Sequence, residues 1–121
     1  MRKITDHIAN PVNDRIEITV MDKPGPGGAH HWYRVTGANG DDLGRLHIPF
    51  QNGPIAEVGV NGVTNEVLLA IVIDRLRSFQ AGPCPSHENS EALRSAETAL
   101  EWLKERTRDR MKRGVEGTSA A

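Results

Sequence analysis

The sequence predicts an α+β fold, a small N-terminal antiparallel β-meander followed by a long αα-hairpin. Residues 15–20 alternate apolar and polar side chains, as a half-buried strand does. After position 64, apolar residues recur instead at helical spacing. We therefore expect a β-rich part at residues 1–62 and a helical part at residues 63–121. With 121 residues there is room for one modest core, so one compact domain is expected overall.

Three runs in the N-terminal half have strand character, at residues 15–20, 30–36 and 43–49. The Pro- and Gly-rich segment Lys23–Gly28 must be a loop, and Asn39-Gly40 is a turn signal. Two more Asn-Gly pairs, at 52–53 and 61–62, bracket a short run at residues 55–60. The pattern predicts a meander of three or four strands.

Two helices are expected after the meander. Thr64 is a suitable N-cap for the first, which runs to about Gln80 and is apolar over so wide an arc that it should be buried on more than one side. The segment 82–85 stops it, and Ser86 caps a second helix with an alanine-rich seam. The tail after Gly114 is expected to be extended and mobile unless something binds it.

Composition narrows the function classes. The net charge is −1 with 26% charged residues, whereas general nucleic-acid binders carry a basic excess. The single cysteine, Cys84, excludes an intramolecular disulfide, and the sequence has no membrane-length apolar run and no signal-peptide pattern. Cys84-x-x-His87 with His30 and His31 invites a zinc interpretation, but a small thiol in a loop is favoured, so no metal and no cofactor are expected. No nucleophile motif is present, so no catalytic residues are expected.

The second helix ends in a row of arginines. Arg106, Arg110 and Arg113 continue the apolar seam within an arc of roughly 60°, because each residue turns the helix by about 100°. Guanidinium groups at the end of a buried stripe are suited to a phosphate. The alternative is a solvated helix end with i to i+4 ion pairs, which the neighbouring Arg108 and Lys112 fit well.

Phe79 and Asn89 bracket the hairpin tip. They could be a core aromatic and an ordinary first-turn polar residue, or a stacking platform and a hydrogen-bonding group for a nucleotide. From Asn89 to Arg106 is roughly 25 Å along a helix, so tip and arginines cannot share one compact site within one chain. If both bind one ligand, two hairpins must pack antiparallel in a dimer.

Several segments resemble the Thoeris anti-defence proteins of the first type, phage-encoded sponges whose helical hairpin is shared with the phage anti-CBASS sponge. The resemblance is strong over about residues 50–118 and loose over the N-terminal strands. The segments that carry it are Phe50–Ile55, Gly59–Val63, Asn65–Leu76, Phe79–Gly82, Glu88-Asn89, Arg106–Arg110 and Arg113–Thr118.

The resemblance implies a non-enzymatic protein that sequesters cyclic ADP-ribose isomers without cleaving them, in the cytoplasm of the infected bacterial host. It also implies cyclic di- and trinucleotides as further ligands of some relatives, and a hexamer built as a trimer of dimers. By the same resemblance, Phe79 stacks on the base and Asn89 bonds the ligand. The partner chain supplies the arginines at 106 and 110 to grip the phosphates. Arg113, Gly117 and Thr118 are further ligand-binding candidates.

Two other functions stay open on the sequence alone. One is an enzyme that degrades the same signal, using a histidine such as His30 or His31. The other is a small nucleic-acid-binding module that uses the basic second helix, which the net charge of −1 weakens.

Overall fold

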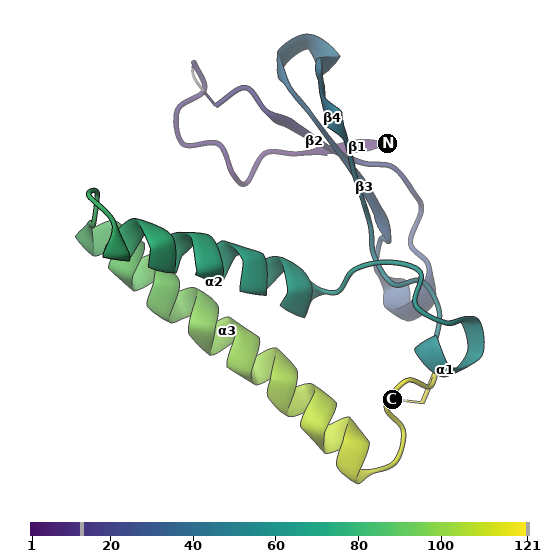
Figure 1. The fold of residues 1–121 in the computed structure, drawn as a ribbon. Helices are drawn as coiled ribbons and strands as arrows, with labels where there is room; N and C mark the ends of the chain where they lie inside the picture. Colours follow the sequence, from purple (N-terminus) through teal and green to yellow (C-terminus); the bar gives the residue numbers. More distant parts are fainter. Residues whose placement is uncertain (13, 121) are drawn as a thin grey trace. The chain divides into compact units, whose positions relative to one another are not determined.

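A computed structural model describes residues 1–12 and 14–120 of the chain. Contacts within the chain divide it into two compact units, Met1–Val63 and Thr64–Ala121. Strands make up the first unit and two long helices the second (Figure 1). The predicted α+β class, a β-meander followed by an αα-hairpin, is confirmed. Within the described residues, none of the helices is both long and apolar enough to cross a membrane.

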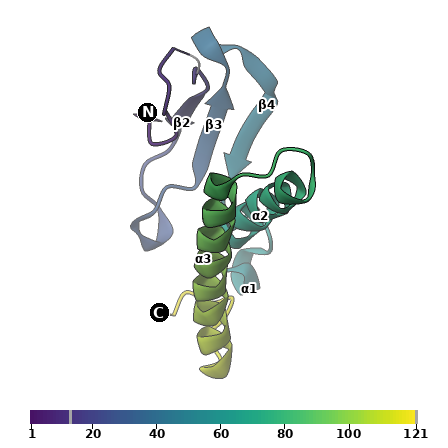
Figure 2. The same ribbon diagram turned by 90° about the vertical axis from the view of Figure 1, so that its left-hand side faces the viewer.

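The sheet has four antiparallel strands in sequence order (Figure 2). The three predicted strands are confirmed within two residues at each end, and the fourth is an N-terminal strand that the sequence did not reveal. A strand of three residues is too short to show alternation, and only its pairing to the second strand defines it. The strands are β1 Arg2–Ile4, β2 Glu17–Val20, β3 Trp32–Thr36 and β4 Asp42–Pro49.

The run at residues 55–60, a candidate strand, is instead a short helix, α1 Ile55–Val58. The carbonyl of Pro54 accepts hydrogen bonds from the backbone N–H groups of Glu57 and Val58. Gly59, at a φ of 76°, ends the turn. Pro54 before these four residues and Gly59 after them therefore favour a helical turn, although the apolar content suggested a strand.

The segments on either side of α1 are joined to each other by side-chain amides. Asn61 Oδ1 accepts from the Asn52 backbone N–H at 2.8 Å, and Asn61 Nδ2 donates to the Asn52 carbonyl at 2.7 Å. Gly62 lies so close to the backbone of Phe50 that a Cβ would come within 2.5 Å of its carbonyl carbon. Only glycine fits there.

The αα-hairpin consists of α2, Asn65–Ala81, and α3, His87–Lys112. Both predicted caps are confirmed: Thr64 Oγ1 accepts from the Val67 N–H at 3.3 Å, and Ser86 Oγ accepts from the Asn89 N–H at 3.0 Å. Gln80 fastens the tip, because its side-chain amide donates to the Ser86 carbonyl and its oxygen accepts from the Ser86 N–H. The tip is therefore a fixed turn that can position a binding surface.

Within the hairpin, α2 packs on α3 and leaves part of its apolar surface uncovered; its burial against the sheet stays a prediction. Ile73 is the buried apolar residue of the hairpin, at 3% exposure, whereas Val67, Ile71 and Val72 are each about half exposed. The apolar content of α2 exceeds what packing on α3 uses.

The tail after Gly114 is not extended. Turns at Val115 and Thr118 fold it back onto the end of α3, where Val115 N–H donates to the Arg110 carbonyl at 3.0 Å. A docked tail could not be predicted from the sequence, because the small residues of the tail bring little apolar area. A single arginine holds it.

Candidate functional site

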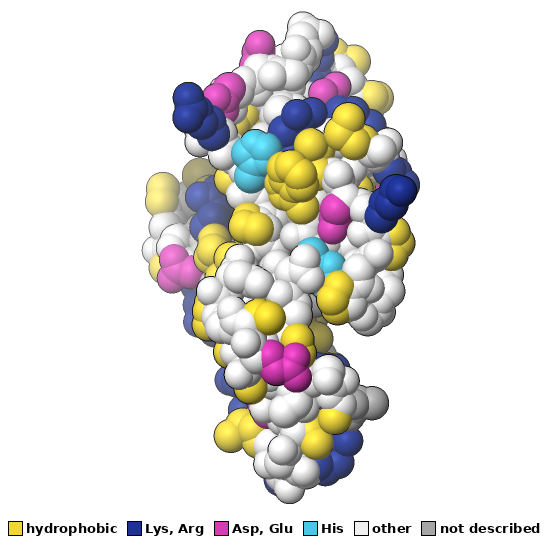
Figure 3. All heavy atoms as spheres, turned by 90° about the vertical axis from the view of Figure 1, so that its right-hand side faces the viewer, with side chains coloured by type: hydrophobic (Ala, Val, Ile, Leu, Met, Phe, Trp, Pro, Cys, Tyr) yellow, Lys and Arg dark blue, Asp and Glu magenta, His cyan; other side chains and the backbone are white. Residues whose placement is uncertain are grey.

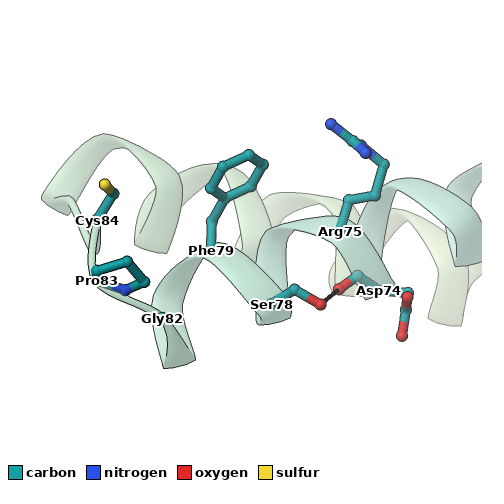
Figure 4. A pocket seen from close by; sticks show the side chains of 7 residues that line it. All are labelled: Asp74, Arg75, Ser78, Phe79, Gly82, Pro83 and Cys84. Atoms are coloured by element: carbon teal, nitrogen blue, oxygen red, sulfur yellow. Dashed lines mark hydrogen bonds between the residues drawn. The ribbon is translucent and has the colours of Figure 1, made fainter.

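A hollow of about 500 Å³ opens at the hairpin tip. It is lined by residues of α2 and of the turn that follows, which are Asp74, Arg75, Ser78, Phe79, Gly82, Pro83 and Cys84 (Figure 4). The Phe79 ring is 47% exposed and stands in this hollow. The interpretation of Phe79 as a core aromatic is therefore wrong, and its ring face is available for stacking.

Arg75 was not among the predicted site residues, yet it shares the hollow with Phe79. Its guanidinium carbon lies 5.7 Å from the centroid of the Phe79 ring, within cation–π range. Figure 4 shows both side chains rising from the same side of α2. Their i, i+4 spacing on one helix is the signal that could have identified Arg75 from the sequence. A cation next to an exposed ring suits a ligand that carries both a base and a phosphate.

Asn89 lies in the first turn of α3, on the other helix of the tip, and is partly buried. Its backbone N–H is used by the Ser86 cap. Its side chain makes no hydrogen bond to any described residue. The amide is thus available to a ligand.

The three arginines of the predicted row have three different environments. Arg106 is exposed, and within the described residues no acceptor pairs with its side chain. Arg113 is exposed and its Nε donates to Asp109 at 3.0 Å. Arg110 is buried. Arg106 and Arg110 lie in α3 and Arg113 is its C-cap, and each arginine meets a different neighbour.

Arg110 is held by its own chain. Its Nε donates to Glu116 at 2.9 Å, and its Nη groups donate to the carbonyls of Val115, Thr118 and Ala120 at 2.7–3.1 Å. Its side chain is 8% exposed. In this state four of the five guanidinium N–H donors are taken by the tail, so a phosphate would have to replace acceptors of the tail to bind in a bidentate way.

Gly117 and Thr118 belong to that docked tail. The Thr118 carbonyl accepts from Arg110, and its hydroxyl donates to the Val115 carbonyl. Gly117 has a φ of 80°, which a turn of this kind reserves for glycine. Both residues act here on Arg110 and on the turn itself, and their contact with a ligand stays a prediction.

The remaining basic residues of α3 fit the solvated-helix alternative. Arg108 pairs with Glu101 and Glu105 at 3.5 and 3.4 Å, and Lys104 pairs with Glu101 at 3.3 Å. The hydrogen bond from Lys104 lowers the pKa of Glu101. The charges on this face of the helix are thus already balanced among themselves, which separates them from Arg106.

The tip and the arginines lie far apart on one continuous helix. Asn89 is in the first turn of α3 and Arg106 near its last turns, with no break between them. Seventeen residues at 1.5 Å each separate them by roughly 25 Å. The hollow around Phe79 therefore has no access to Arg106 of the same hairpin.

Cys84 is exposed in the hollow. Over residues 1–12 and 14–120, no three His, Cys, Asp or Glu side chains come together as a metal-ligand set. His30 and His31 lie in the strand unit. His30 Nδ1 is hydrogen-bonded to the Asp22 carbonyl, and the backbone N–H of His31 donates to the Asp22 carboxylate.

Comparison with known proteins assigns this hairpin to a family. Residues 43–108, more than half of the chain, match the sequence model of the family described as "Acb2/Tad1, hairpin domain". The chain belongs to the Acb2/Tad1 hairpin family. A protein of Bacillus phage SBSphiJ7 named "Thoeris anti-defense 1" is 51% identical to it over 79 residues. That similarity covers 64% of this chain and 56% of the phage protein, so the chain spans a little over half of its curated relative.

The family match covers some of the predicted site residues and leaves others outside. It contains Phe79, Asn89 and Arg106, together with α1 and the whole tip. It ends at residue 108, before Arg110 and the tail that Arg110 holds. The residues most open to a ligand are thus those within the Acb2/Tad1 hairpin.

Proposed function

We propose that this protein is a phage anti-defence sponge that binds cyclic ADP-ribose-type signalling nucleotides and sequesters them without cleavage. It would act against Thoeris immunity in the cytoplasm of the infected bacterial host. Membership in the Acb2/Tad1 hairpin family and the phage relative named for Thoeris anti-defence support the role. The observation that carries the mechanism is the half-exposed Phe79 ring in the hollow at the tip.

The hollow is suited to a nucleotide. Stacking of a base on an aromatic ring contributes about 1–3 kcal/mol by alanine substitution. Arg75, beside the ring, supplies a positive charge for a phosphate, and Asn89 offers an unused amide across the tip. Asp74, in the same hollow, can accept hydrogen bonds from ribose hydroxyl groups or a base amine.

We propose further that the complete site forms between two chains. A phosphate-bearing ring held at the tip needs more cations than Arg75, and Arg106 of the same chain is out of reach. An antiparallel second hairpin would bring its own Arg106 to the tip. Trp102 is 73% exposed and lies one turn before Arg106, and the uncovered apolar side chains of α2 also need a partner surface.

Capture without cleavage is supported by the groups around Phe79. The Ser78 hydroxyl donates to the Asp74 carbonyl at 3.0 Å, a bond within its own helix, and not to a base (Figure 4). The lining residues thus provide stacking, charge and hydrogen bonds, which is what sequestration requires. Cyclic di- and trinucleotides, which some relatives are expected to hold, and the hexamer belong to the same proposal as additional ligands and a higher assembly.

Calorimetric titration with cyclic ADP-ribose isomers, followed by chromatography of the ligand released by heat, tests the proposal. We expect tight binding and recovery of the intact ligand. Recovery of a linear or hydrolysed product would identify an enzyme instead. Absence of binding across the isomers and the cyclic di- and trinucleotides would refute the proposed ligand class.

The substitution Phe79→Ala tests the site itself. We expect a loss of affinity of about 10–100-fold, from the loss of base stacking. Phe79→Leu separates stacking from bulk, because it keeps apolar volume without a π-face. Leu43→Ala, which removes a similarly exposed apolar side chain from the strand unit, is the matched control and should bind normally. Equal binding by Phe79→Ala and Leu43→Ala would show that the site lies elsewhere.

A further inference from the structure

A second cluster of cationic and aromatic side chains lies on one face of the sheet. The strand register aligns Lys3 with Thr19, Thr19 with Arg34 and Arg34 with His47. Because side chains alternate between the faces of a sheet, these four point to the same side, together with Trp32 two residues before Arg34. In the upper part of Figure 3, over the sheet, Lys and Arg side chains lie beside hydrophobic and histidine side chains.

A hollow of about 250 Å³ lies on this face, and Arg34, Arg45 and His47 are among its lining residues. Within the described part of the chain, no oxygen accepts a hydrogen bond from the guanidinium of Arg34 or of Arg45. The Nε of Arg34 is buried in addition and has no partner. A buried charged donor without an acceptor is unfavourable, so an anion that supplies acceptors would be stabilised here.

The two carboxylates that line the hollow already have donors of their own. Glu17 accepts from Lys3 at 3.3 Å, and Asp42 accepts the backbone N–H of Arg45. Neither carboxylate accepts a hydrogen bond from a guanidinium of the two arginines. Lys3, beside Glu17, brings the local cations to three against two carboxylates, so one positive charge is left for a ligand.

An aromatic pair adjoins the hollow. Trp32 stacks on His47 with ring centroids 5.8 Å apart, and its indole N–H donates to His47 Nδ1 at 3.1 Å. Because the indole nitrogen can only donate, His47 Nδ1 is the acceptor and its proton is on Nε2, which can donate to an anion. Trp32 is 41% exposed, so part of its ring surface is open to a planar group.

We propose that this sheet face is a second ligand site, which binds a phosphorylated mononucleotide. Arg34 and Arg45 hold the phosphate oxygens, His47 donates from Nε2, and Trp32 stacks on the base. The site is independent of the hairpin hollow, since every residue in it belongs to the strand unit. A phosphate alone binds more weakly than a mononucleotide, because it lacks the contact with Trp32.

Tryptophan fluorescence tests the proposal directly in the full chain. The chain has two tryptophans, so Trp102→Phe leaves Trp32 as the only indole reporter. In this background, adenosine monophosphate is expected to cause saturable quenching, and inorganic phosphate to compete with it. Adenosine without a phosphate is expected to leave the fluorescence nearly unchanged at the same ionic strength.

Substitutions locate the binding. Arg45→Gln is expected to weaken adenosine monophosphate binding about tenfold or more, through loss of charge-assisted hydrogen bonds. Arg15→Gln removes the same charge from the strand unit outside the hollow and should bind normally. Arg34→Lys keeps the charge but loses the fork, and a smaller loss is expected. Circular dichroism verifies that each variant is folded.

Any one of four results would overturn the inference. One is the absence of saturable quenching at millimolar adenosine monophosphate. Another is an equal loss in Arg15→Gln and Arg45→Gln, which would indicate general charge attraction. The third is binding of a single-stranded oligonucleotide without binding of the mononucleotide, which would assign the face to nucleic acid. Phe79→Ala in the same background must retain the response, and a loss there would assign it to the hairpin tip.

Discussion

Arg110 is expected to determine whether the C-terminal tail is docked. Arg110→Met keeps most of the aliphatic length and removes every donor. The four hydrogen bonds from the guanidinium contribute roughly 6 kcal/mol at about 1.5 kcal/mol each. Ordering the six residues from Val115 to Ala120 costs about the same at roughly 1 kcal/mol per residue. The tail is therefore docked by a narrow margin, and loss of one side chain should release it.

The assay is amide hydrogen exchange resolved by residue, with a thermal melt. In Arg110→Met we expect the amides of residues 115–120 to exchange as an unfolded peptide while α3 stays protected. Because the lost hydrogen bonds and the regained chain entropy nearly cancel, the melting temperature should change by less than about 4 °C, the equivalent of about 1 kcal/mol. Arg108→Gln, which breaks exposed ion pairs only, should leave the tail protected. Unchanged protection of the tail in Arg110→Met would refute the reasoning.

Further predictions concern stability. Ile73→Ala should lower the free energy of unfolding by about 2–4 kcal/mol, measured with urea, because Ile73 is the buried apolar residue of the hairpin. The backbone N–H of His31 lowers the pKa of Asp22 from its ordinary 3.8. The stabilisation by ionised Asp22 is therefore complete above pH 3.8 and is lost as the pH falls through the lowered pKa. Asp22→Asn should accordingly melt lower at neutral pH and lose part of its acid sensitivity, and a pH series of melting temperatures with an unchanged slope would contradict this.

Local signals in the sequence identified most of the fold. Thr64 and Ser86 cap their helices as expected, and the Asn39-Gly40 turn joins β3 to β4. Where local signals conflicted or were short, sequence reasoning failed. Residues 55–58 have strand-like apolar content, but the hydrogen bonds to the carbonyl of Pro54 make them helical. β1 is a strand because it pairs with β2, and this pairing leaves no local signal in the sequence.

The candidate site, too, could be predicted only in part from local signals. Helical spacing correctly placed the tip residues on two facing helix ends and the arginines far from them. Spacing could not distinguish Arg106 from Arg110, because the difference lies in a tail whose acceptors stand five to ten residues beyond Arg110. It also missed Arg34 and Arg45, since their neighbours come from strand pairing. The positions of charged side chains on a helix can be predicted from sequence, whereas the groups that pair with them depend on tertiary contacts.

The proposed division of the site between two chains makes a prediction that mixing can test. Phe79→Ala breaks the tip and Arg106→Ala breaks the arginine end, so each variant alone should bind poorly. After the two are unfolded and refolded together, about half of the dimers are mixed if pairing is random. Each mixed dimer joins the intact tip of one chain to the intact Arg106 of the other, while its second site lacks both.

About a quarter of all sites should therefore regain full affinity, a stoichiometry that calorimetry resolves. A site confined to one chain cannot use Arg106, which is out of reach of its own tip, so Arg106→Ala alone would already bind normally and mixing would add nothing. Refolding each variant alone is the control for the procedure. No regain in the mixture, with mixed dimers verified by mass spectrometry, would exclude the shared site and leave Arg75 as the cation at the tip. Regain near one quarter would follow only if the roughly 25 Å along α3 is bridged by a second chain.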